Sequence, residues 1–201
     1  MGKGVIVLVV LVVIVLAVFG QYIGVKNNLV AKDQAVKAAW SLVDIVLQRR
    51  ADLIPNLVET VKGYAAQEVT VFGDIAKARS ALLSAQTPSD KIAANGQLDG
   101  AIGRLLLVVE NYPQLKSNEN FLRLQDELAG TENRIAVERK RYNDTLQDYN
   151  TYVLQFPNSL FAGYAGFKQN PAYFQATEAS RVVPKVDFNA KPAAPATAPA
   201  H

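Results

Sequence analysis

The sequence predicts an all-α protein: an amino-terminal transmembrane helix followed by a long antiparallel four-helix bundle with up-down topology. Three observations lead to this fold class. An apolar run lies near the amino terminus, apolar side chains recur at helical spacing over most of the remaining chain, and prolines separate these stretches. The chain has 201 residues, which is enough for one domain with its own core.

The apolar run covers residues 5–19, where no side chain carries a polar atom. Counted as 5–23, it spans roughly 28 Å as a helix, close to the thickness of the bilayer's hydrocarbon. Tyr22 stands where an interfacial aromatic would anchor the helix. Residues 1–23 are therefore predicted to be a transmembrane anchor. The alternative is a cleaved signal peptide, which the positive start and the small residues near the end of the run would suit.

Residues 24–156 are predicted to form the bundle. The first helix is expected over 23–54 and has a wide apolar sector, typical of a helix with two or more neighbours. Pro55 is expected to kink or break it. The second helix is expected over 55–84. Its apolar side chains, with Glu68 among them, recur as a heptad seam: Leu57, Val61, Tyr64, Glu68, Val71, Ile75, Ala78 and Leu82. The first helix also carries a second apolar stripe, which motivates a prediction of self-association: Ala35, Ala39, Leu42, Val46 and Leu53.

The third helix is expected to start with Ser89 as its N-cap and to end before Tyr112. Glycines usually weaken a helix, so three of them here suggest that a neighbouring backbone approaches closely. They are Gly96, Gly100 and Gly103. The fourth helix should begin at Ser117 or Asn118 and run to about Gln155. Its predicted core stripe is Phe121, Leu124, Leu128, Ile135, Tyr142, Leu146, Tyr149 and Val153.

Residues 157–188 are rich in aromatic side chains and are predicted to be a short helix and extended chain packed on the bundle. Binding of a partner or of lipid is the alternative for this segment. Residues 189–201 are rich in Ala and Pro and should be disordered.

Composition excludes several classes of protein. The chain has no cysteine, and its single histidine is the last residue, His201, so thiol chemistry and a histidine metal site or base within the fold are excluded. Basic and acidic residues are nearly balanced, 21 against 18, without the basic cluster of a nucleic-acid binder. We therefore expect no cofactor, no metal and no nucleic-acid partner.

Several segments resemble the LemA family over roughly residues 22–188. These segments are 39–44, 48–58, 61–64, 78–79, 110–116, 128–135, 141–143, 156–157 and 184–188. The resemblance implies a bacterial membrane protein with a helical-bundle domain and no established enzymatic activity. Family members are discussed in terms of membrane organisation and association with membrane proteases. The family often has a histidine before the glutamate of the second helix, but this chain has Gln67 before Glu68, so a metal or proton-relay role based on that histidine fails here.

Two sets of residues are candidates for a function or for a structural network. The first is a partner or oligomer surface around the family's densest motif: Trp40, Asp44, Arg49, Arg50, Asp52 and Asn56. Its alternative is a polar network that tolerates the kink at Pro55. The second set is expected to be interhelical ion pairs rather than catalytic acids, because an unpaired buried carboxylate is costly: Glu68, Glu132, Arg134, Arg139 and Arg141.

These patterns predict a non-enzymatic, single-pass scaffold or adaptor of the bacterial inner membrane that associates with itself through helical faces. The alternative is a regulatory or substrate-presenting partner of a membrane protease. The lysines on either side of the apolar run do not decide which side of the membrane the bundle faces.

Overall fold

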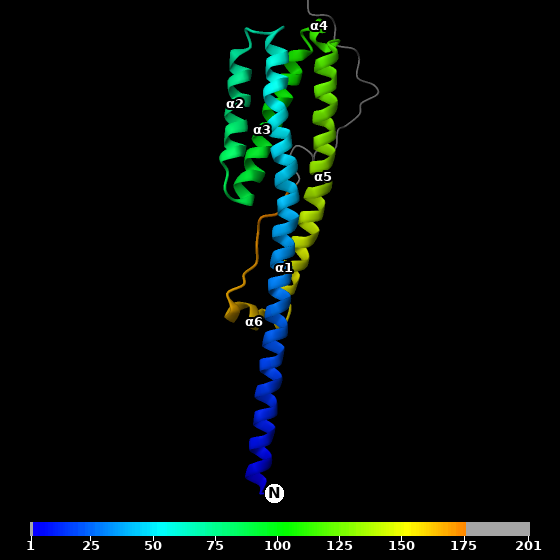
Figure 1. The fold of residues 1–201 in the computed structure, drawn as a ribbon. Helices are drawn as coiled ribbons and strands as arrows, with labels where there is room; N and C mark the ends of the chain where they lie inside the picture. Colours follow the sequence, from blue (N-terminus) through cyan, green and yellow to red (C-terminus); the bar gives the residue numbers. More distant parts are fainter. Residues whose placement is uncertain (1, 176–201) are drawn as a thin grey trace, which may run out of the picture.

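The computed structural model describes residues 2–175 (Figure 1). This part of the chain is helical and contains no strand, so the predicted all-α class is confirmed. The predicted tail 189–201, including His201, and residues 176–188 of the aromatic segment lie outside the described residues. The six helices are α1 (Lys3–Lys62), α2 (Val69–Ser84), α3 (Pro88–Val109), α4 (Pro113–Lys116), α5 (Glu119–Leu154) and α6 (Asn158–Ala165).

Helix α1 leads from the apolar run into the folded domain without a break (Figure 1). The large side chains of residues 5–19 are exposed, whereas burial begins at Val25 and Leu29 and then recurs along one side of the helix. With 60 residues, α1 is about 90 Å long. The apolar run and the first helix of the domain are therefore one continuous rod.

Two helices in the described part of the chain, α1 and α3, are long and apolar enough to cross a membrane. None of the apolar window of α1 is buried inside the protein, while 39% of the window of α3 is buried. Because α3 contributes Leu98 and Leu105 to the core, its apolar character is explained by packing within the domain.

The predicted break at Pro55 is wrong, because α1 continues through this proline to Lys62. A proline inside a helix costs about 3 kcal/mol. Here the Pro55 ring lies on the exposed side, and the neighbouring Ala51, Ile54 and Leu57 are fully buried. Burial of these side chains offsets the cost of the proline, so tertiary packing overrides the local signal.

The predicted single helix over 55–84 is also wrong. The chain leaves the helix after Lys62, and α2 begins at Val69. Tyr64, expected on the seam, is exposed, and Glu68 precedes the first residue of α2. The heptad spacing continues across this loop by coincidence, since Leu57 belongs to α1 and Ile75 to α2.

The helices are arranged as two antiparallel pairs (Figure 1). Helix α5 follows α1 along most of the domain, and this is the most extensive contact in the molecule. Helices α2 and α3 form a shorter hairpin that packs beside the end of α1 remote from the amino terminus. We call residues 3–24 of α1 the stalk; between the stalk and this hairpin, α1 and α5 continue as a pair.

The predicted apolar stripe of α5 is confirmed as a core face. Seven of its eight residues are buried, and Leu124 is half-buried. The beginning of α5 is also as expected, because the Asn118 side chain caps the helix by accepting hydrogen bonds from the backbone N–H groups of Asn120 and Phe121.

Two expectations for the third helix are wrong. Thr87, not Ser89, is the N-cap of α3: its hydroxyl oxygen accepts the backbone N–H of Asp90, and Pro88 occupies the first turn. The three glycines do not mark a close approach of another backbone. A side chain added at Gly96, Gly100 or Gly103 would meet no atom within 4 Å, because all three lie on the exposed side of the helix.

After α5, the chain turns into α6 and then runs extended back along the α1–α5 pair. We call residues 167–175 the strap. The strap is held by aromatic packing of Phe167, Tyr173 and Phe174 against the core. Within α6, Phe161 packs against the core, but Tyr164 is exposed. In the described part of this segment, most aromatic side chains thus pack on the core, and Tyr164 faces outward.

Candidate functional site

The structure separates the predicted partner surface into residues that point inward and residues that remain accessible. Trp40 is half-buried, and its ring lies 5.2 Å from that of Tyr142 and 6.1 Å from that of Phe174, centroid to centroid. Asp44 forms an ion pair with Lys91 of α3. Arg50, with only 7% of its surface exposed, points into the domain. These three side chains bind other parts of their own chain.

Arg49, Asp52 and Asn56 remain on the exposed side of α1. Their spacing of three and four residues places them on one face of the helix. Asp52 accepts a hydrogen bond from the Gln48 side chain at 2.9 Å, a local contact that leaves the face accessible. We call these three residues the Arg49 face. It is the part of the predicted surface that a partner can reach.

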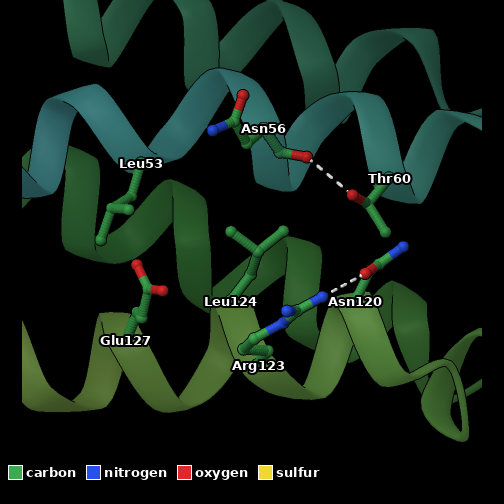
Figure 2. A pocket seen from close by; sticks show the side chains of 7 residues that line it. All are labelled: Leu53, Asn56, Thr60, Asn120, Arg123, Leu124 and Glu127. Carbon is green, nitrogen blue, oxygen red and sulfur yellow. Dashed lines mark hydrogen bonds between the residues drawn. The ribbon is translucent and has the colours of Figure 1, made fainter.

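A groove borders this face between α1 and α5 (Figure 2). It has a volume of about 360 Å³, and polar side chains from both helices line most of it. Arg123 donates to the Asn120 side chain at 2.6 Å, while Glu127 provides a carboxylate one turn further along α5. The lining residues are Leu53, Asn56, Thr60, Asn120, Arg123, Leu124 and Glu127.

The second apolar stripe of the first helix does not form a separate surface. Ala39 is buried, Leu42 is half-buried, and Val46 and Leu53 pack against the core, whereas Ala35 is exposed. The stripe is largely covered by the protein's own chain because α5 and the strap together bury a wide sector of α1. It therefore no longer motivates self-association, and a docking role rests on the Arg49 face instead.

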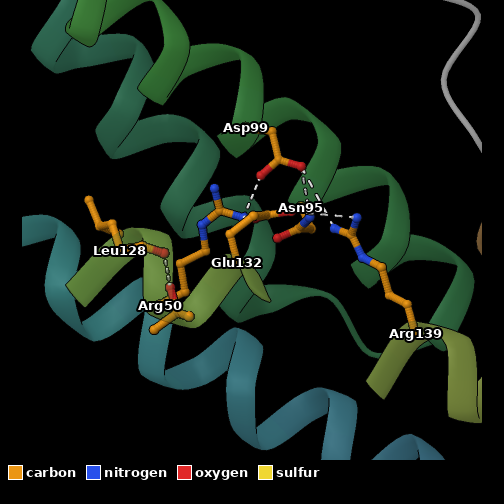
Figure 3. Close-up of polar contacts among 7 residues, drawn as sticks. Arg50, Asn95, Asp99, Leu128, Glu132 and Arg139 are labelled. Atoms are coloured by element: carbon orange, nitrogen blue, oxygen red, sulfur yellow. Dashed lines mark hydrogen bonds and ion pairs between the residues drawn. The ribbon is translucent and has the colours of Figure 1, made fainter. Parts of the chain in front are cut away.

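A network of charged side chains joins α1, α3 and α5 beneath this region (Figure 3). Nη1 of Arg50 lies 2.6 Å from Oδ1 of Asp99 and 2.6 Å from Oε2 of Glu132. Arg139 approaches Asp99 at 3.7 Å and Glu132 at 4.0 Å. The Asn95 amide donates to Asp99 at 3.0 Å. We call these five residues the Arg50 network.

The charges in the Arg50 network balance, with two guanidinium groups facing two carboxylates. Burial is the main influence on Asp99 and raises the pKa of its carboxyl group above 3.8. Arg50 opposes this effect by favouring the ionised form, and Glu132 adds to it by repulsion. Among the charged neighbours, Arg50 most strongly favours the ionised form of Asp99, and it also contacts Glu132, which makes Arg50 the central residue of the network.

Part of the predicted ion-pair set belongs to the network and part does not. Glu132 and Arg139 are members, whereas Arg134 and Arg141 are exposed on α5. The predicted pairing of Glu68 with an arginine of α5 is wrong. The Glu68 carboxylate instead accepts a hydrogen bond from the Tyr112 hydroxyl at 3.4 Å, at the end of the domain where α2 begins.

Sequence analysis missed Asn95 and Asp99. Both lie next to the apolar stripe of α3, four residues apart and on either side of buried Leu98. Polar side chains at helical spacing beside a core stripe are the signal that could have found them. It also missed Asn150, which is buried within the core stripe of α5 and binds the strap.

The described residues contain no group of three acidic, histidine or cysteine side chains arranged to hold a metal ion. A protein-family model described as the LemA family matches residues 39–188. The chain belongs to the LemA family. The match includes the Arg50 network, the groove and most of the domain, and the apolar run of α1 lies outside it.

The chain is also similar to three individual proteins, one of which is itself named LemA. Magnetosome protein MamQ 2 of Paramagnetospirillum magneticum is 30% identical over 175 residues, covering 74% of this chain and 64% of the relative. Magnetosome protein MamQ of Magnetospirillum gryphiswaldense is 26% identical over 169 residues, covering 71% and 62%. Protein LemA of Metamycoplasma hominis is 26% identical over 162 residues, covering 80% and 74%. The chain spans just under two thirds of the length of these MamQ relatives.

The structure brings two of the LemA-like motifs together. Residues 48–58 lie on α1 and include Arg50, while residues 128–135 lie on α5 and include Glu132. Their side chains meet in the Arg50 network. These two motifs therefore supply the ion pair that joins α1 to α5 near the groove.

Proposed function

We propose that this protein is a single-pass, membrane-anchored scaffold or adaptor of the bacterial inner membrane. The observation that carries the proposal is the continuity of α1. Its apolar residues 5–19 are exposed, and the same helix then forms the spine of the domain. Lipid would cover the apolar side chains, and a lone helix satisfies its own backbone hydrogen bonds in hydrocarbon.

A continuous helix would hold the domain upright on the bilayer, with little freedom to bend at the point of exit. At the end of the domain farthest from the membrane, α1, α2, α3 and α5 would form an up-down bundle. The α1–α5 pair would hold this bundle away from the bilayer. In this proposal the groove and the Arg49 face form the working surface.

We propose that this surface acts by docking and not by catalysis. Its charges support self-association, because Arg49 and Asp52 on α1 have opposite signs, as do Arg123 and Glu127 on α5. A surface that carries both signs can pair with its own copy across a two-fold axis, where each cation meets the partner's anion. The Arg50 network supports the same view, since its charged groups bind one another.

Insertion of a charge into the apolar run tests the anchor. Val12→Arg is expected to release a large share of the protein from liposomes in a flotation assay after a high-salt wash. The physical reason is the cost of about 2.5–3.5 kcal/mol for arginine at the centre of a bilayer. Val137→Arg is the matched control, because Val137 is an exposed valine of α5 and should leave membrane binding unchanged. Equal flotation of both variants would refute the anchor.

Charge reversal tests the docking face. Arg49→Glu alone and Asp52→Arg alone are each expected to weaken self-association about two- to thirtyfold, since two-fold symmetry doubles each new repulsion of about 0.2–1 kcal/mol. An equimolar mixture of the two variants should associate again, because opposite charges then face each other. The measurement is analytical ultracentrifugation of the full chain in detergent.

Lys140→Glu is the control for this measurement, because Lys140 is exposed, belongs to a local pair with Asp144 and lies outside the groove. A wild-type protein that stays monomeric at every concentration would overturn self-association. If crosslinking in cells then joined the Arg49 face to a membrane protease, the alternative role as a protease partner would be favoured.

A further inference from the structure

Helix α6 lies against α1 at the point where the free stalk joins the domain (Figure 1). The Tyr22 ring centroid is 6.2 Å from that of Phe161 and 5.8 Å from that of Tyr164. Ala162, on the same side of α6 as Phe161, is almost completely buried. Aromatic contacts therefore fix α6 at the level of Tyr22 along α1.

The charged residues on either side of the apolar run indicate at what depth Tyr22 lies relative to the bilayer. Lys3 and Lys26 are the charged residues on either side of the apolar run, and roughly 34 Å of helix separates them. This distance slightly exceeds the hydrocarbon thickness of about 30 Å. With both lysines at headgroup level, Tyr22 lies one turn inside the boundary, and α6 lies there with it.

The outer side of α6 is apolar and exposed. Leu160 is 65% exposed and Tyr164 is 85% exposed, four residues apart on one face of the helix. Phe156, just before α6, is 81% exposed. Residues 149–167 contain no charged side chain, and the first charge beyond them is Lys168. Water is an unfavourable environment for such a surface, whereas the boundary between headgroups and acyl chains suits it.

An apolar slot lies between α6 and the stalk. Its volume is about 500 Å³, and every side chain that lines it is aliphatic or aromatic. Four of them belong to the apolar run itself, so the slot opens at the depth of the hydrocarbon. The lining residues are Ile14, Val15, Val18, Phe19, Tyr22, Phe161 and Tyr164.

We infer that α6 is a lipid-binding foot of the domain, and this inference rests on the proposed anchor. Leu160, Tyr164 and Phe156 enter the interfacial layer of the bilayer, and a phospholipid acyl chain occupies the slot. Lys26, whose ammonium lies 6.0 Å from the Tyr22 ring centroid, faces the phosphate groups. The foot adds a second contact beside the stalk and thereby sets the depth and tilt of α1.

Lipid fits this surface better than a second copy of the chain. The slot is lined by the segment that the anchor places in hydrocarbon, and the exposed face of α6 continues from that segment. A phospholipid bilayer is therefore already in contact with one edge of the surface, and α6 extends this contact by one helix.

Spin labels test the foot directly, because the chain has no native cysteine. Leu160→Cys and Tyr164→Cys, each labelled with a nitroxide, are placed in the full chain in phosphatidylglycerol-containing nanodiscs. Power-saturation electron paramagnetic resonance then measures collisions with oxygen, which concentrates in lipid, and with a water-soluble nickel chelate. Val12→Cys reports on the anchor, and Val137→Cys reports on the exposed surface of α5.

The expected result is that the labels at 160 and 164 collide readily with oxygen and lose most of their nickel relaxation relative to the label at 137. Labels at 160 and 164 that match the label at 137, while the label at 12 reports lipid, would overturn the foot and leave the anchor intact. A label at 12 that is accessible to nickel would overturn the anchor itself. Strong dipolar broadening between labels at 160 would show a second copy on this face and would also overturn the foot.

Discussion

Replacing Arg50 with methionine is expected to lower the free energy of unfolding by about 3 kcal/mol. Methionine keeps part of the apolar stem of Arg50 and removes the charge that lies 2.6 Å from both Asp99 and Glu132. Loss of one partner from a buried ion pair costs about 3–5 kcal/mol, because a charge is left uncompensated. The lower end of that range applies because Asp99 and Glu132 retain 37% and 44% of their side-chain exposure.

Urea denaturation followed by circular dichroism measures the effect of Arg50→Met. Arg104→Met is the matched control, since Arg104 pairs with Asp74 at 2.9 Å but is 63% exposed, and a surface pair is worth less than about 1 kcal/mol. Adding Asp99→Asn to Arg50→Met should recover much of the loss, because Arg139 then balances the one remaining carboxylate of the network, that of Glu132. Similar unfolding energies for Arg50→Met and Arg104→Met would show that the network does not hold the helices.

The same variant has a characteristic pH dependence. Burial raises the pKa of Asp99 in the folded protein above 3.8, so the charged carboxylate costs stability at neutral pH. This cost disappears as the pH falls through the raised pKa and the carboxyl group takes up a proton. Arg50 lowers the pKa of Asp99, so its removal should raise that pKa further. The stability gap between wild type and Arg50→Met is therefore expected to narrow on mild acidification.

Replacing Asn150 with leucine is expected to release the strap. The Asn150 amide donates to the Asn170 carbonyl at 2.7 Å and to the Tyr173 hydroxyl at 2.9 Å, and its oxygen accepts the Asn170 backbone N–H at 2.8 Å. Three hydrogen bonds at about 1 kcal/mol each predict a loss of about 3 kcal/mol in the energy needed to open the strap. That loss corresponds to about a hundredfold faster exchange of the Asn170 amide hydrogen.

Hydrogen exchange followed by mass spectrometry measures the release of the strap. Asn133→Leu is the control, since Asn133 is an exposed asparagine on the same helix. The Phe174 N–H, held by the Asn143 side chain at 3.0 Å, should also lose protection in Asn150→Leu, because the strap opens as one segment. Unchanged exchange at Asn170 would mean that the aromatic contacts alone hold the strap. Opening of the strap would also uncover Trp40, and its fluorescence provides a second readout.

Much of the fold followed from local patterns. The stripe from Phe121 to Val153 predicted the core face of α5, and Asn118 predicted its beginning, because a regular helical period and an N-cap act over a few residues. Pro55 shows where local signals fail. The effect of Pro55 depends on whether its ring faces solvent and on how much apolar surface the neighbouring side chains bury. Neither follows from the tripeptide around it.

The candidate site was predicted less well than the fold. Six residues on α1 were expected to form a surface, but Trp40, Asp44 and Arg50 turn toward the strap, α3 and α5. An i, i+3, i+4 spacing gives the relative angles of side chains around a helix but does not say which side of the helix is covered. Asp99 could not be named as Arg50's partner, because these residues approach only when α3 packs beside α1.

By itself, the sequence determined an apolar run long enough to span a bilayer, a helical chain, the core stripe of α5 and membership of the LemA family. Each depends on the order and spacing of residues along the chain. Only the tertiary structure decided that stalk and domain share one helix, that Arg50 meets Asp99, and that α6 lies beside Tyr22. These depend on contacts between residues far apart in sequence, where the burial gained across several helices outweighs the preference of any one segment.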